Sequence, residues 1–164
     1  MKTLRQMIDQ LTATPLRLML LATAGSAALL IAVFVFQALG YVPCKLCWWQ
    51  RYPHMAAVAI GLLAVAWRPA AIVAWLGAAA AAATGLIGVY HTGVERKWWT
   101  GPDECSADAV GGQSAQDLLN QIMAAPLVRC DEVAWSLLGV SMASWNAIAS
   151  FMLMAIWIMA ARRA

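Results

Sequence analysis

The stretch VPCKLCWWQRYP, residues 42–53, holds both the most reactive side chains of the chain and a boundary between two apolar segments. Cys44 and Cys47 form a CxxC motif, and Arg51 follows the second cysteine by four residues. The apolar run from Pro53 to Trp67 would extend only about 22 Å as a helix, too short for a hydrocarbon core of about 30 Å. A helix beginning near Cys47 would extend about 31 Å, so the length predicts that Cys47 lies in its first turn.

The composition outside this stretch indicates a membrane protein. The 164 residues are 63% hydrophobic and 12% charged, whereas soluble domains carry roughly 25% charge. We expect an all-α integral membrane fold, a single-domain bundle (residues 1–164) of four transmembrane helices at about 18–39, 47–67, 70–90 and 138–161. Small residues between Gly77 and Gly88 would let neighbouring helices approach closely. The lipid bilayer is the expected partner, and the absence of a basic stripe away from the membrane flanks argues against nucleic acid.

An even number of spans places both termini on one side of the membrane. The positive-inside rule favours a cytoplasmic location for that side, because its short segments carry six cations: Lys2, Arg5, Arg17, Arg68, Arg162 and Arg163. The loops at 40–46 and 91–137, which hold Cys44, Cys105 and Cys130, would then face the opposite compartment, with Cys47 at the adjoining helix start. For a chain of bacterial character this is the periplasm, where disulfides persist.

The second pair of cysteines, Cys105 and Cys130, leaves two interpretations open. A disulfide between them could staple the long loop, or it could exchange with the Cys44–Cys47 pair through a mixed disulfide. A thiolate at Cys47 would be favoured by the positive end of its helix and by Arg51 at i+4, although Arg51 could also extend to lipid headgroups. No metal is expected, because a zinc site would want four clustered ligands.

Four pieces of the chain together resemble a known family. They are PCKLCWWQR at 43–51, YHTGVERKWWTGPDEC at 90–105, Cys130, and GVSMASWN at 139–146. The sequence resembles the quinone-linked bacterial disulfide bond formation protein B family, and the matching pieces keep their order over nearly all of the chain.

The resemblance implies an electron route in the bacterial inner membrane. A reduced, soluble, periplasmic thioredoxin-like thiol oxidase would attack the Cys105–Cys130 disulfide at Cys105. Cys130 would pass the electrons to Cys44, and Cys47 would then interact with ubiquinone from the membrane quinone pool, or with menaquinone. Arg51 would lie beside the quinone ring, and His91 occupies roughly the position of a quinone-proximal histidine.

Three other interpretations remain for the same residues. The chain could be a four-span protein with purely structural disulfides, or a quinone reductase serving one dedicated thiol partner. It could also anchor a cofactor such as haem, which would require paired histidines inside the membrane. The chain has only His54 and His91, and their placement does not suit that role.

Overall fold

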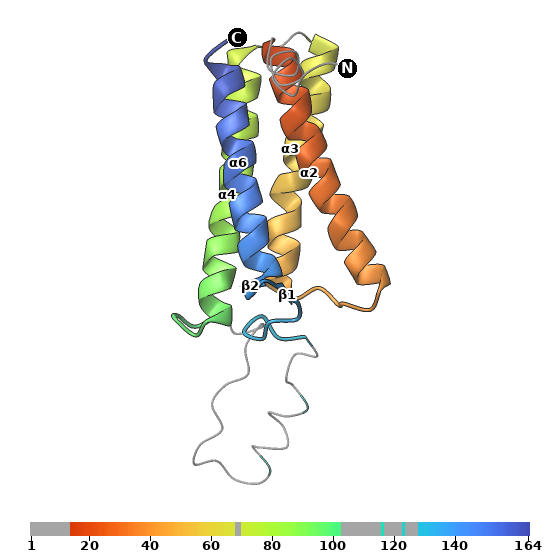
Figure 1. Ribbon diagram of the computed structural model, residues 1–164, viewed down its shortest axis with the longest axis vertical. Helices are drawn as coiled ribbons and strands as arrows, with labels where there is room; N and C mark the ends of the chain where they lie inside the picture. The colour runs from red at the N-terminus through yellow and green to blue at the C-terminus, as the bar shows by residue number, and fades with distance from the viewer. Residues whose placement is uncertain (1–13, 68–69, 103–115, 117–122, 124–127) are drawn as a thin grey trace.

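Four long helices build the protein, shown by a computed structural model that describes residues 14–67, 70–102, 116, 123 and 128–164. Among these residues α2 begins and α6 ends at the same end of the bundle, while the start of α3 and the end of α4 lie at the other end (Figure 1). A short hairpin of two strands also lies at that second end. The elements are α2 (Pro15–Ala38), α3 (Lys45–Trp67), α4 (Ala71–Glu95), β1 (Ser136–Leu137), β2 (Val140–Ser141) and α6 (Met142–Ala161).

Three of the described helices, α2, α4 and α6, are long and apolar enough to cross a membrane. The remaining helix, α3, has 23 residues and continues through Pro53. Its first half carries Gln50, Arg51 and His54, all of which are buried. We therefore expect the functional site in the polar half of α3.

Small residues bring the helices together, in agreement with the pattern between Gly77 and Gly88. A Cβ atom at Gly77 on α4 would lie 2.5 Å from the ring of Trp157 on α6, which is completely buried. Gly25 on α2 faces Leu153 on α6 in the same way. The absence of a side chain at these positions sets the distance between neighbouring helices.

Two helix ends differ from the expected boundaries. Helix α4 continues to Glu95, so His91 lies on the helix and not in the loop that was expected to begin there. Helix α6 begins at Met142, because Leu138 and Gly139 adopt φ values of 54° and 75° in the hairpin turn, which a helix cannot continue. Ser141 then caps α6 by accepting a hydrogen bond from the Ser144 amide.

Candidate functional site: a cluster of three cysteines and a histidine

The CxxC pair lies at the beginning of α3, as the length of the apolar segment predicted. Cys44 precedes the helix and Cys47 is in its first turn, where the Cys47 amide donates to Cys44 Sγ at 3.2 Å. Both are free cysteines, and the Cys44 thiol donates to Cys47 Sγ at 2.9 Å. That hydrogen bond and burial both raise the pKa of Cys44. The proton shared by the pair therefore stays on Cys44, which leaves Cys47 as the more nucleophilic sulfur.

A third cysteine, Cys130, lies against this pair. Cys130 is completely buried and disulfide-bonded, while Cys105 lies outside the described residues. The sulfurs of Cys44 and Cys130 and a ring nitrogen of His91 all lie within 4.8 Å of one another. Three such groups could in principle bind a metal, but a disulfide sulfur is not a thiolate ligand. The arrangement instead favours thiol–disulfide exchange between Cys44 and Cys130.

His91 connects this cluster to the interior of the bundle. Its Nε2 atom is 3.6 Å from Cys44 Sγ, and its Nδ1 atom is 2.8 Å from Nε2 of Gln50. Gln50 is bound in turn by Asn146 of α6, whose Nδ2 donates to Gln50 Oε1 at 2.8 Å. Asn146 Oδ1 is 3.0 Å from Nε2 of His54. A chain of polar contacts thus runs from the sulfurs toward the middle of the bundle.

Arg51 lies inside the protein, close to the CxxC pair. It is 5% exposed, and its Nη1 donates to Oε1 of Gln37 on α2 at 2.7 Å. The guanidinium also lies over the rings of Phe34 and Trp48, at 5.0 and 4.6 Å from their centroids. Its Nε atom is buried without a hydrogen-bond partner. This placement differs from that of an arginine extended to lipid headgroups, and it leaves one N–H group for a ligand.

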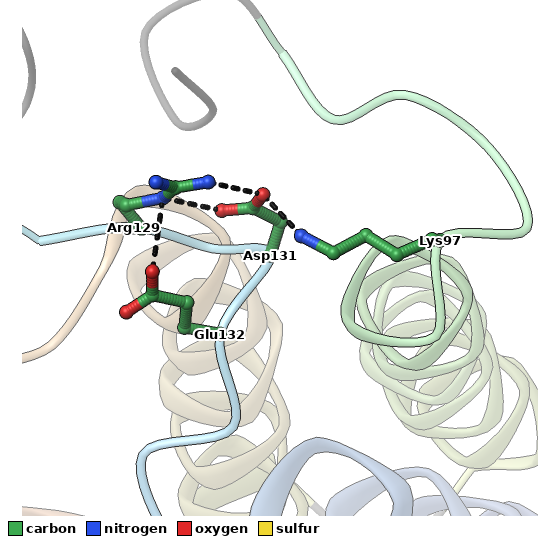
Figure 2. A network of polar contacts seen from close by, with 4 residues as sticks. All are labelled: Lys97, Arg129, Asp131 and Glu132. Carbon is green, nitrogen blue, oxygen red and sulfur yellow. Dashed lines mark hydrogen bonds and ion pairs between the residues drawn. The ribbon is translucent and has the colours of Figure 1, made fainter. Parts of the chain in front are cut away.

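Ion pairs hold the segment around Cys130 to the end of α4 (Figure 2). Lys97, which directly follows α4 and its cap, pairs with Asp131. Asp131 also binds Arg129 Nη2 at 2.7 Å, and Arg129 Nε reaches Glu132 at 3.3 Å. The Arg129 hydrogen bonds and then the Lys97 ammonium hold the pKa of the Asp131 carboxyl well below its usual range. Both neighbours of Cys130 along the chain are therefore anchored.

A pocket adjoins the cysteines. Apolar side chains of α2, including Leu29, Leu30, Val33 and Phe36, line it together with polar groups of α3 and α4. Cys44, Cys47, Arg51 and His91, four of the residues predicted from the sequence, all border this pocket. Gln50, Gln37 and Asp131 were not predicted from the sequence as parts of the site. Gln50 lies in the quoted CxxC stretch, three residues after Cys47 and on the same helix face. This spacing could have identified it as a site residue.

A helical bundle with apolar spans, a CxxC pair and a third cysteine in contact with it defines a membrane protein of thiol–disulfide chemistry. The profile of the family described as "Disulfide bond formation protein DsbB" matches residues 15–160, and the chain belongs to this family. The family implies a membrane disulfide oxidoreductase that acts in disulfide bond formation.

A curated relative is similar over most of its length. The "Uncharacterized protein RP370" of Rickettsia prowazekii (strain Madrid E) is 27% identical over 127 residues, which cover 76% of this chain and 72% of the relative. No solved structure matches the chain significantly. The family assignment therefore rests on the profile and agrees with the residues quoted from the sequence.

Proposed function

We propose that the protein reoxidises a soluble, periplasmic, thioredoxin-like dithiol oxidase and passes the electrons through its two cysteine pairs to ubiquinone. In this proposal all four helices cross the bacterial inner membrane, the termini are cytoplasmic, and the cysteine loops are periplasmic. The observation that carries it is the cluster of Cys44, Cys130 and His91, whose sulfur and nitrogen atoms lie within 4.8 Å of one another. Exchange between two cysteine pairs requires such proximity.

Each step of the proposed exchange forms one sulfur–sulfur bond and breaks another. A thiolate of the partner attacks Cys105, a bond forms between them, and Cys130 leaves with the electron pair of the broken disulfide. When Cys44 and Cys47 are oxidised to a disulfide, Cys130 then attacks Cys44, the Cys44–Cys130 bond forms, the Cys44–Cys47 bond breaks, and Cys47 leaves as a thiolate. The first turn of α3 and the nearby Arg51 favour negative charge at Cys47. Electrons therefore move from the Cys105–Cys130 pair to Cys47, which borders the pocket.

The residues of the pocket fit a quinone. Its apolar wall from α2 suits a ring with a lipid tail, and the unpartnered Nε–H group of buried Arg51 suits a carbonyl oxygen. We assign Arg51 and His91, which both line the pocket, as the residues that border the ring. A bound quinone supplies a two-electron, two-proton acceptor. Nothing in these features distinguishes ubiquinone from menaquinone, and ubiquinone is the acceptor we propose.

Single cysteine variants test the route. The purified protein in detergent is mixed with a reduced thioredoxin-like oxidase and a soluble quinone, and quinone reduction is followed optically. Cys44→Ser, Cys47→Ser, Cys105→Ser and Cys130→Ser should each abolish turnover. When Cys130→Ser is mixed instead with the oxidised partner, the Cys105 thiolate should attack the partner's disulfide and capture it as a mixed disulfide. Normal turnover of Cys47→Ser would contradict the quinone-facing assignment. Turnover that no cysteine variant changes would support purely structural disulfides.

Labelling in intact cells tests the orientation. A membrane-impermeant maleimide should reach Cys105 after mild reduction, but it should not reach a cysteine introduced by Ala164→Cys. Permeabilised cells provide the control, because both positions should then react. Labelling that places Cys44 and Cys105 in opposite compartments would leave the proposed electron route without a path.

A further inference from the structure

The position of the proton on His91 follows from its neighbours. The amide nitrogen of Gln50 lies 3.3 Å from the carbonyl oxygen of Leu46, which can only accept a hydrogen bond. This fixes the orientation of the Gln50 amide, and the same nitrogen reaches His91 Nδ1 at 2.8 Å. Nδ1 therefore accepts, and the neutral ring carries its proton at Nε2. That proton faces Cys44 Sγ, 3.6 Å from Nε2.

His91 also reaches the other cysteine of the cluster. A ring nitrogen of His91 lies within 4.8 Å of the Cys130 sulfur, and the residue is 4% exposed. His91 thus contacts two segments that are distant in the sequence, the residue that opens α3 and the segment that follows the long loop. Both ring nitrogens are engaged with groups of the protein.

We infer that His91, held in its Nε2–H tautomer by Gln50, is a positioning residue that fixes Cys130 against Cys44 for exchange between the two cysteine pairs. This inference deepens the proposed function and rests on it, because it concerns the internal transfer between the pairs. In that transfer the Cys44–Cys130 bond forms while one existing disulfide breaks, and the displaced sulfur keeps the electron pair. His91 neither gains nor loses electrons.

The ion pairs drawn in Figure 2 also hold the Cys130 segment. Lys97 and Arg129 bind Asp131, and the Lys97 side chain is 61% exposed, whereas His91 is buried. An exposed cation fixes where the segment lies, but it does not set the direction of the Cys130 sulfur. The contact from His91 is directional, and it reaches the atoms that exchange.

In a variant with only two cysteines, this positioning can be measured without quinone and without the thiol partner. In the full-length Cys47→Ser/Cys105→Ser protein, Cys44 and Cys130 are the remaining cysteines. Their disulfide is quantified at equilibrium with a glutathione redox buffer. Adding His91→Gln should lower the equilibrium constant for the Cys44–Cys130 disulfide about three- to ten-fold, the effect of losing a hydrogen bond. Adding Ser26→Ala, a control at a buried polar residue of α2 that does not line the pocket, should leave it unchanged.

A second variant keeps the imidazole and changes only its tautomer. The carboxylate of Gln50→Glu would accept from Nδ1, so the proton would leave Nε2 and the contact with Cys44 would lose its donor. The disulfide equilibrium should fall as it does for His91→Gln. Nitrogen chemical shifts of the labelled histidines should report an Nε2–H tautomer in the parent chain and an Nδ1–H ring in Gln50→Glu.

The outcomes separate the inference from the proposed function. If the two-thiol chain forms no Cys44–Cys130 disulfide at all, the route through the cysteine pairs is wrong. If the disulfide forms, and neither His91→Gln nor Gln50→Glu changes its equilibrium constant, the route stands and the role of His91 is wrong. An Nδ1–H tautomer in the parent chain would likewise overturn the inference.

Discussion

Arg51 of α3 and Gln37 of α2 are joined by a hydrogen bond of 2.7 Å from Nη1 to Oε1, and Arg51 lines the same pocket as Cys47. If Arg51 binds a quinone oxygen, Arg51→Met should raise the KM for a soluble quinone about ten- to hundred-fold, since hydrogen bonds to charged groups contribute about 1.5–3 kcal/mol. The kcat should change less. Steady-state kinetics with varied quinone concentration provides the measurement.

Two further variants control for the loss of charge. Arg162→Gln removes a cation at the opposite end of the bundle, after the last turn of α6, and should leave the KM unchanged. Arg51→Lys keeps the charge but loses the planar fork, so its KM should lie between those of the parent and Arg51→Met. An unchanged KM for Arg51→Met would show that Arg51 only packs α3 against α2.

The ion pairs at Asp131 predict a pH dependence of stability. Because the folded pKa of Asp131 is depressed, its stabilisation is fully present above the unfolded pKa, about 4. It is lost as the pH falls from there through the lower folded pKa. Asp131→Asn should therefore be less stable than the parent at pH 7, and the difference should shrink below about pH 4. Thermal unfolding followed by circular dichroism from pH 7 to pH 3 measures it.

The comparison with Lys97→Gln tests the cause of that pH dependence. Lys97 contacts Asp131 but is the more exposed partner, whereas Arg129 makes two hydrogen bonds to the same carboxylate. Lys97→Gln should therefore lose less stability at pH 7 than Asp131→Asn. A difference between the parent and Asp131→Asn that stays constant down to pH 3 would contradict the role of the carboxylate.

Helix packing at Gly77 predicts a loss of stability from one added methyl group. In Gly77→Ala the new Cβ would lie 2.5 Å from the fully buried Trp157 ring, and overpacking of this kind costs about 1–3 kcal/mol. Gly85→Ala is the matched variant, because its Cβ would meet the Phe151 ring at 3.0 Å or more. Thermal unfolding in detergent should show a larger loss for Gly77→Ala, and equal losses would contradict this account.

Local patterns in the sequence predicted much of the arrangement. The length of the apolar segment placed the start of a helix near Cys47, and α3 begins at Lys45. The small residues after Gly77 predicted close helix contacts. The end of α4 was not predicted, because the polar residues after Tyr90 resemble a loop. His91 and Thr92 continue the helix instead, and Thr92 Oγ1 bonds the carbonyl of Gly88.

Contacts between distant residues could not be predicted from such patterns. Gln50 and Asn146 are 96 positions apart, and the packing of α4 against both α3 and α6 brings them together. The tautomer of His91 depends on the same contact, through the orientation of the Gln50 amide. Asn146 lies in the quoted GVSMASWN piece, but its partners Gln50 and His54 of α3 and Thr84 of α4 are visible only in the structure.

Asn146 therefore offers a test of the interior polar chain. It binds Gln50 Oε1, Thr84 Oγ1 at 3.2 Å and His54 Nε2. Asn146→Leu should leave buried Gln50 and His54 without these partners, at a cost of about 1–3 kcal/mol for each unsatisfied group. Thermal unfolding should show this loss. The Cys44–Cys130 equilibrium of the two-thiol chain should also fall, because Gln50 would no longer be held against His91. Asn146→Ser keeps a hydroxyl that reaches fewer partners, so it should be intermediate in both measurements. An Asn146→Leu protein as stable as the parent would show that these contacts contribute little to the fold.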